Sequence, residues 1–164
     1  MKNFSLFLIL SILLLVFSIS CKCKKKTSNN TTNLAKKEAK ETSIPYKILF
    51  NNDHSNIKDE ENVVIKNISD LKAIYASINS TRRPGLPLPK VDFNKEEVLG
   101  IFLGEKSSAG YEIQINSIQN NGKEIVVNYK IKTPKGMASM VITQPTLLVL
   151  IPKFDLPVIF KKGE

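Results

Sequence analysis

An alternation of apolar and polar residues in the segments 111–116 and 127–132 is the strongest constraint on how this chain folds. Successive side chains of a β-strand point to opposite faces, so a period of two indicates strands with one buried face. The two segments flank Asn120-Asn121-Gly122, a typical hairpin turn. The pattern therefore predicts an antiparallel hairpin. Its expected inward residues are Tyr111, Ile113, Ile115, Ile125, Val127, Tyr129 and Ile131.

The rest of the chain from position 44 adds short extended segments and one helix. The continuous apolar run 98–103 predicts a strand covered on both faces. Ser69 is expected as the N-cap of a helix that buries one apolar side. We therefore predict a mainly β domain, an antiparallel β-sandwich or barrel-like fold of seven or eight short strands with one helix. The further strands are expected at 44–50, 63–65, 137–143, 147–151 and 158–160, and the helix should bury Leu71, Ile74, Tyr75 and Ile78.

The first twenty residues are typical of a secretory signal peptide. Lys2 supplies a positive start, residues 4–19 are apolar apart from serines, and small residues precede Cys21. A cysteine at that place resembles a bacterial lipobox, so we expect Cys21 to be lipidated. Cys23 is not expected to be, because Lys22 precedes it. The alternative is an uncleaved membrane helix, although the segment is near the lower limit of about 17 residues for spanning a bilayer.

Residues 21–43 are expected to form a lipidated, flexible tether. The segment is polar and short of large apolar side chains, and it holds seven lysines against two glutamates. Much of the net charge of +9 therefore lies in the tether, where Lys24-Lys25-Lys26 suits anionic lipid headgroups. We expect the lipid bilayer as a partner through Cys21, and no nucleic acid. The expected location is the bacterial envelope, at the outer membrane facing the periplasm.

The predicted domain shows no arrangement of residues that indicates catalysis, a cofactor or a metal. Its sequence has no cysteine, because both cysteines lie in the tether. The single histidine, His54, is expected to be a surface residue in a loop. Asp59-Glu60-Glu61 lacks the alternating ligand spacing of a calcium loop. A pair of carboxylates for glycoside hydrolysis stays open from sequence alone, but we expect a protein that is not an enzyme.

The second half of the domain resembles the PrcB-type family. The resemblance rests on Asp92-Phe93, the apolar strand and Gly-Tyr turn at 100–111, and the segments 141–145 and 148–153. It implies a PrcB-like β domain over residues 44–164. The founding member of the family is a lipoprotein that accompanies and stabilises a surface protease complex. The resemblance thus implies a membrane-anchored accessory module with a protein partner, such as a protease, rather than a catalyst.

Two loops are candidate partner-binding surfaces. The first is Ser107-Ser108-Ala109-Gly110-Tyr111, whose small residues allow close approach and whose tyrosine could anchor a partner. It also resembles the Thr-Gly-Tyr loop of chagasin-type protease inhibitors, which is the alternative function. In the other interpretation, Gly110 only makes a turn and Tyr111 faces the core. The second candidate is Arg82-Arg83 with the stiff Pro-Leu stretch that follows, which either docks a partner or merely crosses the end of the sandwich.

Overall fold

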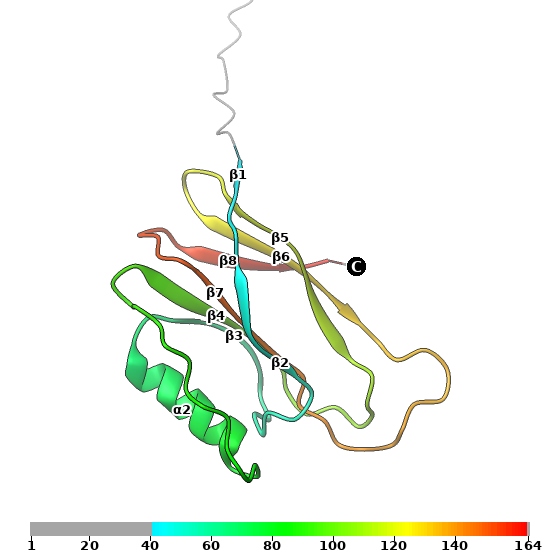
Figure 1. Cartoon of the computed structure of the whole chain (residues 1–164). Coiled ribbons are helices and arrows are strands. Elements are labelled where there is room, and N and C mark those ends of the chain that lie inside the picture. Colours follow the sequence, from blue (N-terminus) through cyan, green and yellow to red (C-terminus); the bar gives the residue numbers. More distant parts are fainter. Residues whose placement is uncertain (1–40, 164) are drawn as a thin grey trace, which may run out of the picture. The chain divides into compact units, whose positions relative to one another are not determined.

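The computed structural model describes residues 41–163, which form a mainly β domain with two four-stranded sheets and one helix (Figure 1). One sheet has the strand order β1-β5-β6-β8 and the other has the order β2-β7-β4-β3. The two sheets pack as a sandwich, not as a closed barrel, which confirms the predicted fold class. The elements are β1 (Thr42–Ser43), β2 (Lys47–Asn52), β3 (Glu60–Ile65), α2 (Ile68–Asn79), β4 (Glu96–Leu103), β5 (Glu112–Asn120), β6 (Ile125–Lys132), β7 (Thr146–Pro152) and β8 (Val158–Lys162).

The alternating segment forms the predicted hairpin of β5 and β6. Its register pairs Ile113 with Ile131 and Asn120 with Ile125. A bulge between Ile115 and Ser117 shifts the alternation by one residue, so that Ile118 points inward. On the far side of β6, β8 pairs in parallel, whereas the other strand pairs are antiparallel. The hairpin prediction is therefore correct, and the bulge is a detail that it lacked.

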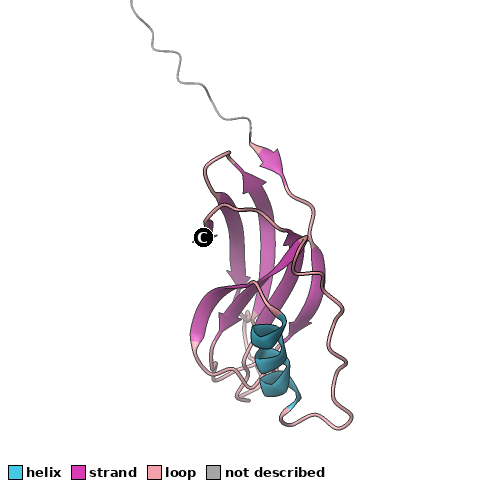
Figure 2. Ribbon diagram, turned by 90° about the vertical axis from the view of Figure 1, so that its left-hand side faces the viewer, coloured by secondary structure: helices cyan, strands magenta, loops and turns pink. Residues whose placement is uncertain are grey.

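Two apolar clusters share the strand β4. Its residues Leu99, Ile101 and Leu103 face the cluster between the two sheets. Val98 and Phe102 face the opposite cluster, under the helix. Figure 2 shows the helix on one side of the strands. Strand β4 is thus covered on both faces, as its continuous apolar run predicted.

The helix begins two residues earlier than predicted. Asn67, not Ser69, is its N-cap, and the side-chain Oδ1 of Asn67 accepts a hydrogen bond from the backbone N–H of Asp70 at 2.9 Å. Asparagine is as good an N-cap as serine, so residue type alone did not distinguish the two positions. The predicted apolar side of the helix is correct, because Leu71, Tyr75 and Ile78 are buried.

Two expected strands differ in the structure. The segment 137–143 is not a strand, and only Thr143 forms an isolated bridge, to Lys106. The expected strand 44–50 begins only at Lys47, as β2, because Ile44 and Pro45 carry the chain from β1 in one sheet to the other sheet. Proline has no N–H to offer a sheet, which suits a position between two strands.

Residues 1–40 and 164 lie outside the described part of the chain, so the predictions of a signal peptide, of lipidation at Cys21 and of most of the tether fall outside the described residues. Within residues 41–163, the helix is too short and too polar to cross a membrane.

Candidate functional site

Three loops converge at one end of the sandwich, which we call the loop end. They are the β2–β3 loop (residues 53–59), the β4–β5 loop (104–111) and the β6–β7 loop (133–145). The register brings them together, because Glu60 lies opposite Leu103 and Phe102 lies opposite Thr146. The β5–β6 turn and the β7–β8 connection lie at the opposite end of the sandwich.

Backbone hydrogen bonds join the three loops. Lys106 and Thr143 exchange two bonds of 2.8 and 2.9 Å between the β4–β5 and β6–β7 loops. The N–H of Gln144 donates to the carbonyl of Asp53 at 2.7 Å, which ties in the β2–β3 loop. The loop end is therefore one connected structure rather than three separate loops.

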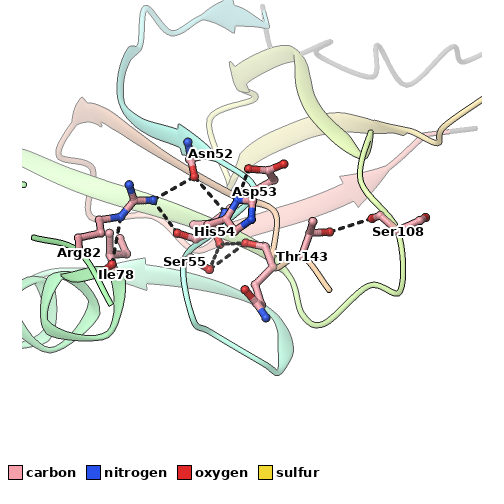
Figure 3. A network of polar contacts seen from close by, with 10 residues as sticks. Asn52, Asp53, His54, Ser55, Ile78, Arg82, Ser108 and Thr143 are labelled. Atoms are coloured by element: carbon pink, nitrogen blue, oxygen red, sulfur yellow. Dashed lines mark hydrogen bonds and ion pairs between the residues drawn. The ribbon is translucent and has the colours of Figure 1, made fainter. Parts of the chain in front are cut away.

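The predicted candidate loop lies at the centre of this end. The carbonyl of Ser108 accepts a bond of 2.9 Å from the hydroxyl of Thr143 (Figure 3), and the N–H of Ala109 donates to the carbonyl of Ser139 at 3.1 Å. Ser107 and Gly110 remain exposed.

Gly110 and Tyr111, at the end of this loop, have different structural roles. Gly110 has a φ of 97°, in the region that favours glycine, as its predicted turn role requires. Tyr111 is half-buried and packs against the cluster between the sheets. Its aromatic ring thus contributes to the core, and the part of the loop that a partner can reach is centred on Ser107 and Gly110.

The β6–β7 loop carries an exposed apolar surface that sequence reasoning missed. Met137 and Met140 are almost fully exposed, at 105% and 94%, and Val141 and Ile142 are also exposed. The apolar run had suggested a strand, although its members do not alternate, and that lack of alternation was the available signal. We call residues 137–142 the apolar loop.

A groove of about 1050 Å³ lies between the apolar loop, the Ala109-Gly110 segment and the ends of β5 and β6. Its lining is basic, with Lys130, Lys132 and Lys135 against Glu112. The side chain of Glu112 accepts a bond from Lys132 at 3.3 Å, and both side chains are exposed. The loop end thus combines exposed apolar side chains with unbalanced positive charge.

The second predicted candidate surface contains two arginines that make different contacts. The guanidinium of Arg82 donates to the carbonyl of His54 at 2.7 Å and to Oδ1 of Asn52 at 3.0 Å, and it lies 5.8 Å from the ring centroid of Phe50 (Figure 3). These contacts hold the β2–β3 loop against the C-terminal end of the helix. Arg83 is exposed and donates to the carbonyl of Arg82 at 2.7 Å.

Replacing Arg82 by methionine should destabilise the domain by about 1–3 kcal/mol, because hydrogen bonds from a charged donor and a ring contact are lost. Urea unfolding of the purified protein measures this change. Arg83→Met serves as the matched control and should change the free energy of unfolding by less than about 0.5 kcal/mol. Equal effects of the two substitutions would contradict a structural role specific to Arg82.

His54 lies on the surface, as predicted, with its Nδ1 2.6 Å from Oδ1 of Asp53. The neighbouring hydroxyl of Ser55 is fully buried; it donates to the carbonyl of Gln144 at 2.9 Å and accepts from Thr146 at 2.8 Å. This serine is therefore held away from solvent and does not form a nucleophile–base pair with His54. Within residues 41–163, no three His, Cys, Asp or Glu side chains are grouped so that they could hold a metal ion.

Comparison with known proteins gives one match. Residues 98–152 match the family model described as PrcB C-terminal. No curated protein and no solved structure matches the chain. The matched segment runs from within β4 to the end of β7 and contains both the Ser107–Tyr111 loop and the apolar loop. The match supports the resemblance to the PrcB-type family that the sequence indicated, over residues 98–152.

Proposed function

We propose that this protein is a membrane-anchored lipoprotein whose β domain is an accessory module of a protease complex and binds its partner through the loop end. The observation that carries the proposal is that the segment matching the PrcB C-terminal family contains the exposed apolar loop. Exposed methionines are adaptable contact residues, and clustered exposed apolar side chains mark interaction surfaces.

The position at which the chain enters the domain supports partner binding at the loop end. The first described strand, β1, pairs Thr42 with Asn120, beside the β5–β6 turn. The chain therefore enters the domain at the end of the sandwich opposite the loop end (Figure 1). A lipid on Cys21 and a tether over residues 21–43 would then leave the loop end free to reach a partner in the periplasm.

The accessory role is tested by complementing a deletion strain with the full chain and quantifying envelope proteases by mass spectrometry. The variants are wild type, Cys21→Ala, and Met137→Ser combined with Met140→Ser. Ile159→Ser is the matched control, since it removes an exposed apolar side chain from β8. We expect one protease subunit to fall in the deletion strain, in the double-methionine variant and in Cys21→Ala, but to be restored by Ile159→Ser. Unchanged protease amounts in all strains would refute the accessory role.

Inhibition of a protease by the Ser107–Tyr111 loop is the second candidate function, favoured by the exposure of Ser107 and Gly110 at the loop end. The same strains distinguish it from the accessory role. An inhibitor would leave the amount of the protease unchanged, and its deletion would raise proteolytic activity. Ser107→Arg in the full chain should then abolish inhibition, since a bulky side chain at the tip would block entry into a cleft.

A further inference from the structure

One sheet of the sandwich has a strand edge that is only partly covered. Strand β1 pairs with β5 at Asn120 and Gln119 alone, and the N–H of Ile44 adds one bond to the carbonyl of Ile118 at 2.8 Å. The chain then crosses to the other sheet. Among the described residues, no strand pairs with this edge of β5 over residues 112–117. We call residues 112–117 the open edge.

The backbone direction along the open edge follows from the pairing with β6. Tyr129 lies opposite Ile115, and its carbonyl points to the β8 side, where it accepts a bond from the N–H of Gly163 at 2.7 Å. Opposite residues of an antiparallel pair direct their backbone groups either both toward or both away from each other. Ile115 therefore directs its N–H and C=O toward the open edge, and so does Ile113, two residues earlier.

The open edge borders a groove between β5 and β2, which consists of two adjoining hollows of about 330 and 360 Å³. The first has polar and apolar lining in about equal parts. Its lining includes Tyr46 and Ile48, which are 42% and 52% exposed, together with Ile113, Ile115 and Leu147. Exposed apolar side chains beside unpaired backbone groups are what an added strand would cover.

The second hollow has the opposite charge to the chain as a whole. Asp53 and Glu112 line it, and the described residues that line the two hollows include no lysine or arginine, although the chain carries a net charge of +9. A segment that lies in this groove should therefore carry a basic side chain at one end and an apolar side chain at the other.

We infer that the open edge binds an extended segment of a partner protein, with an apolar residue toward one end and a basic residue toward the other, as an added strand next to β5. The segment would run antiparallel to β5 and continue the line of β1, with backbone bonds to Ile113 and Ile115. Its apolar side chain would contact Ile48, and its basic side chain would face Glu112. This surface adjoins the loop end, because Asp53 and Tyr111 line its second hollow. The inference uses the backbone of β5 at Ile113 and Ile115, so it does not depend on the proposed accessory role.

The probe for this inference is the peptide acetyl-TIRVTIR-amide, compared with acetyl-TIEVTIE-amide, added to the purified full-length protein. Binding is followed by fluorescence anisotropy, and amide hydrogen exchange is read at Ile113 and Ile115. We expect the arginine peptide to bind about tenfold or more tightly than the glutamate peptide, and to slow exchange of both amides about tenfold or more. A peptide N-methylated at alternate residues should not bind.

Two substitutions with matched controls locate the site. Ile48→Lys should weaken binding of the arginine peptide about tenfold. Ile159→Lys should not weaken it, because Ile159 lies on β8, at the opposite edge of the sheet that contains β5. Glu112→Lys should weaken it likewise, while Glu61→Lys on β3 should not.

Equal binding of the two peptides, or loss of binding with the control substitutions, would overturn the inference. Slow exchange at Ile113 and Ile115 without peptide, together with a dimer in sedimentation, would also overturn it, because a second copy of the chain would then occupy the edge.

Discussion

Gly104→Ala should destabilise the domain by about 2–5 kcal/mol and disorder the loop end. Gly104 ends β4 with a φ of 66°, a conformation that costs an ordinary residue energy. A Cβ there would also lie 2.7 Å from the carbonyl of Lys58 and 2.8 Å from the N–H of Glu60. Both neighbours are backbone atoms, so neither can rotate away. The same junction carries the 3.0 Å bond from the N–H of Glu105 to Lys58, which would be lost.

The matched control is Gly136→Ala in the β6–β7 loop. Gly136 has a similar φ of 76°, but a Cβ there would have no atom within 4 Å. It should therefore cost only the backbone strain, about 1–2 kcal/mol. Urea unfolding compares the two variants. If both lose the same free energy, the close approach of the β2–β3 loop to Gly104 does not contribute to stability, and the connected loop end would be contradicted.

Glu97→Met should stabilise the domain at neutral pH by about 1–3 kcal/mol, because it removes a buried carboxylate without a partner. Glu97 is 1% exposed and lies on the same face of β4 as Leu99. Neither of its carboxylate oxygens has a hydrogen-bond partner among the described residues. Methionine has a similar length and no charge, so it fits the site without this cost.

The pH dependence of this effect has a definite sign. Burial raises the pKa of Glu97 above its ordinary value of 4.5, and Asp155 adds to the rise. The charges of Lys66 and Lys153 and the backbone of Phe154 lower the pKa, but burial is the larger effect. The folded protein thus holds the proton more tightly than the unfolded chain. The carboxyl therefore favours folding below pH 4.5, and this contribution is lost as the pH rises through the raised pKa.

The advantage of Glu97→Met over wild type should accordingly be small near pH 4 and grow toward pH 7.5. Urea unfolding at several pH values measures it, with Glu61→Met on β3 as the exposed control. An advantage that does not change with pH would contradict the raised pKa. A loss of stability at pH 7.5 would show that Glu97 has a stabilising partner.

The parts of the fold that depend on local periodicity were predictable. The β5–β6 hairpin follows from the alternation around Asn120–Gly122, and the burial of β4 follows from its unbroken apolar run. The helix start was ambiguous because Asn67 and Ser69 are both good N-caps, and only the bond from the N–H of Asp70 decides between them. The bulge after Ile115 was missed, although the apolar pattern shifts by one residue between Ile115 and Ile118, which is its trace in the sequence.

The candidate site was predictable only in part. The Ser107–Tyr111 loop could be identified from its small residues and its glycine. The apolar loop was missed, because its composition is that of a strand, and the lack of alternation in residues 137–142 was the one signal against a strand. The contacts of Arg82 with His54 and Asn52 span about thirty positions of sequence and arise only when the helix has packed against the sheet that contains β2.

The most direct test of the account is photocrosslinking from the loop end in intact cells. A benzoylphenylalanine at Met140 of the full chain, and another at Lys123 in the β5–β6 turn of the opposite end, would be compared by mass spectrometry of the crosslinked products. We predict that the Met140 probe captures a subunit of a protease complex and that the Lys123 probe does not. Capture of that subunit from Lys123 alone, or of no protease from either position, would contradict the account.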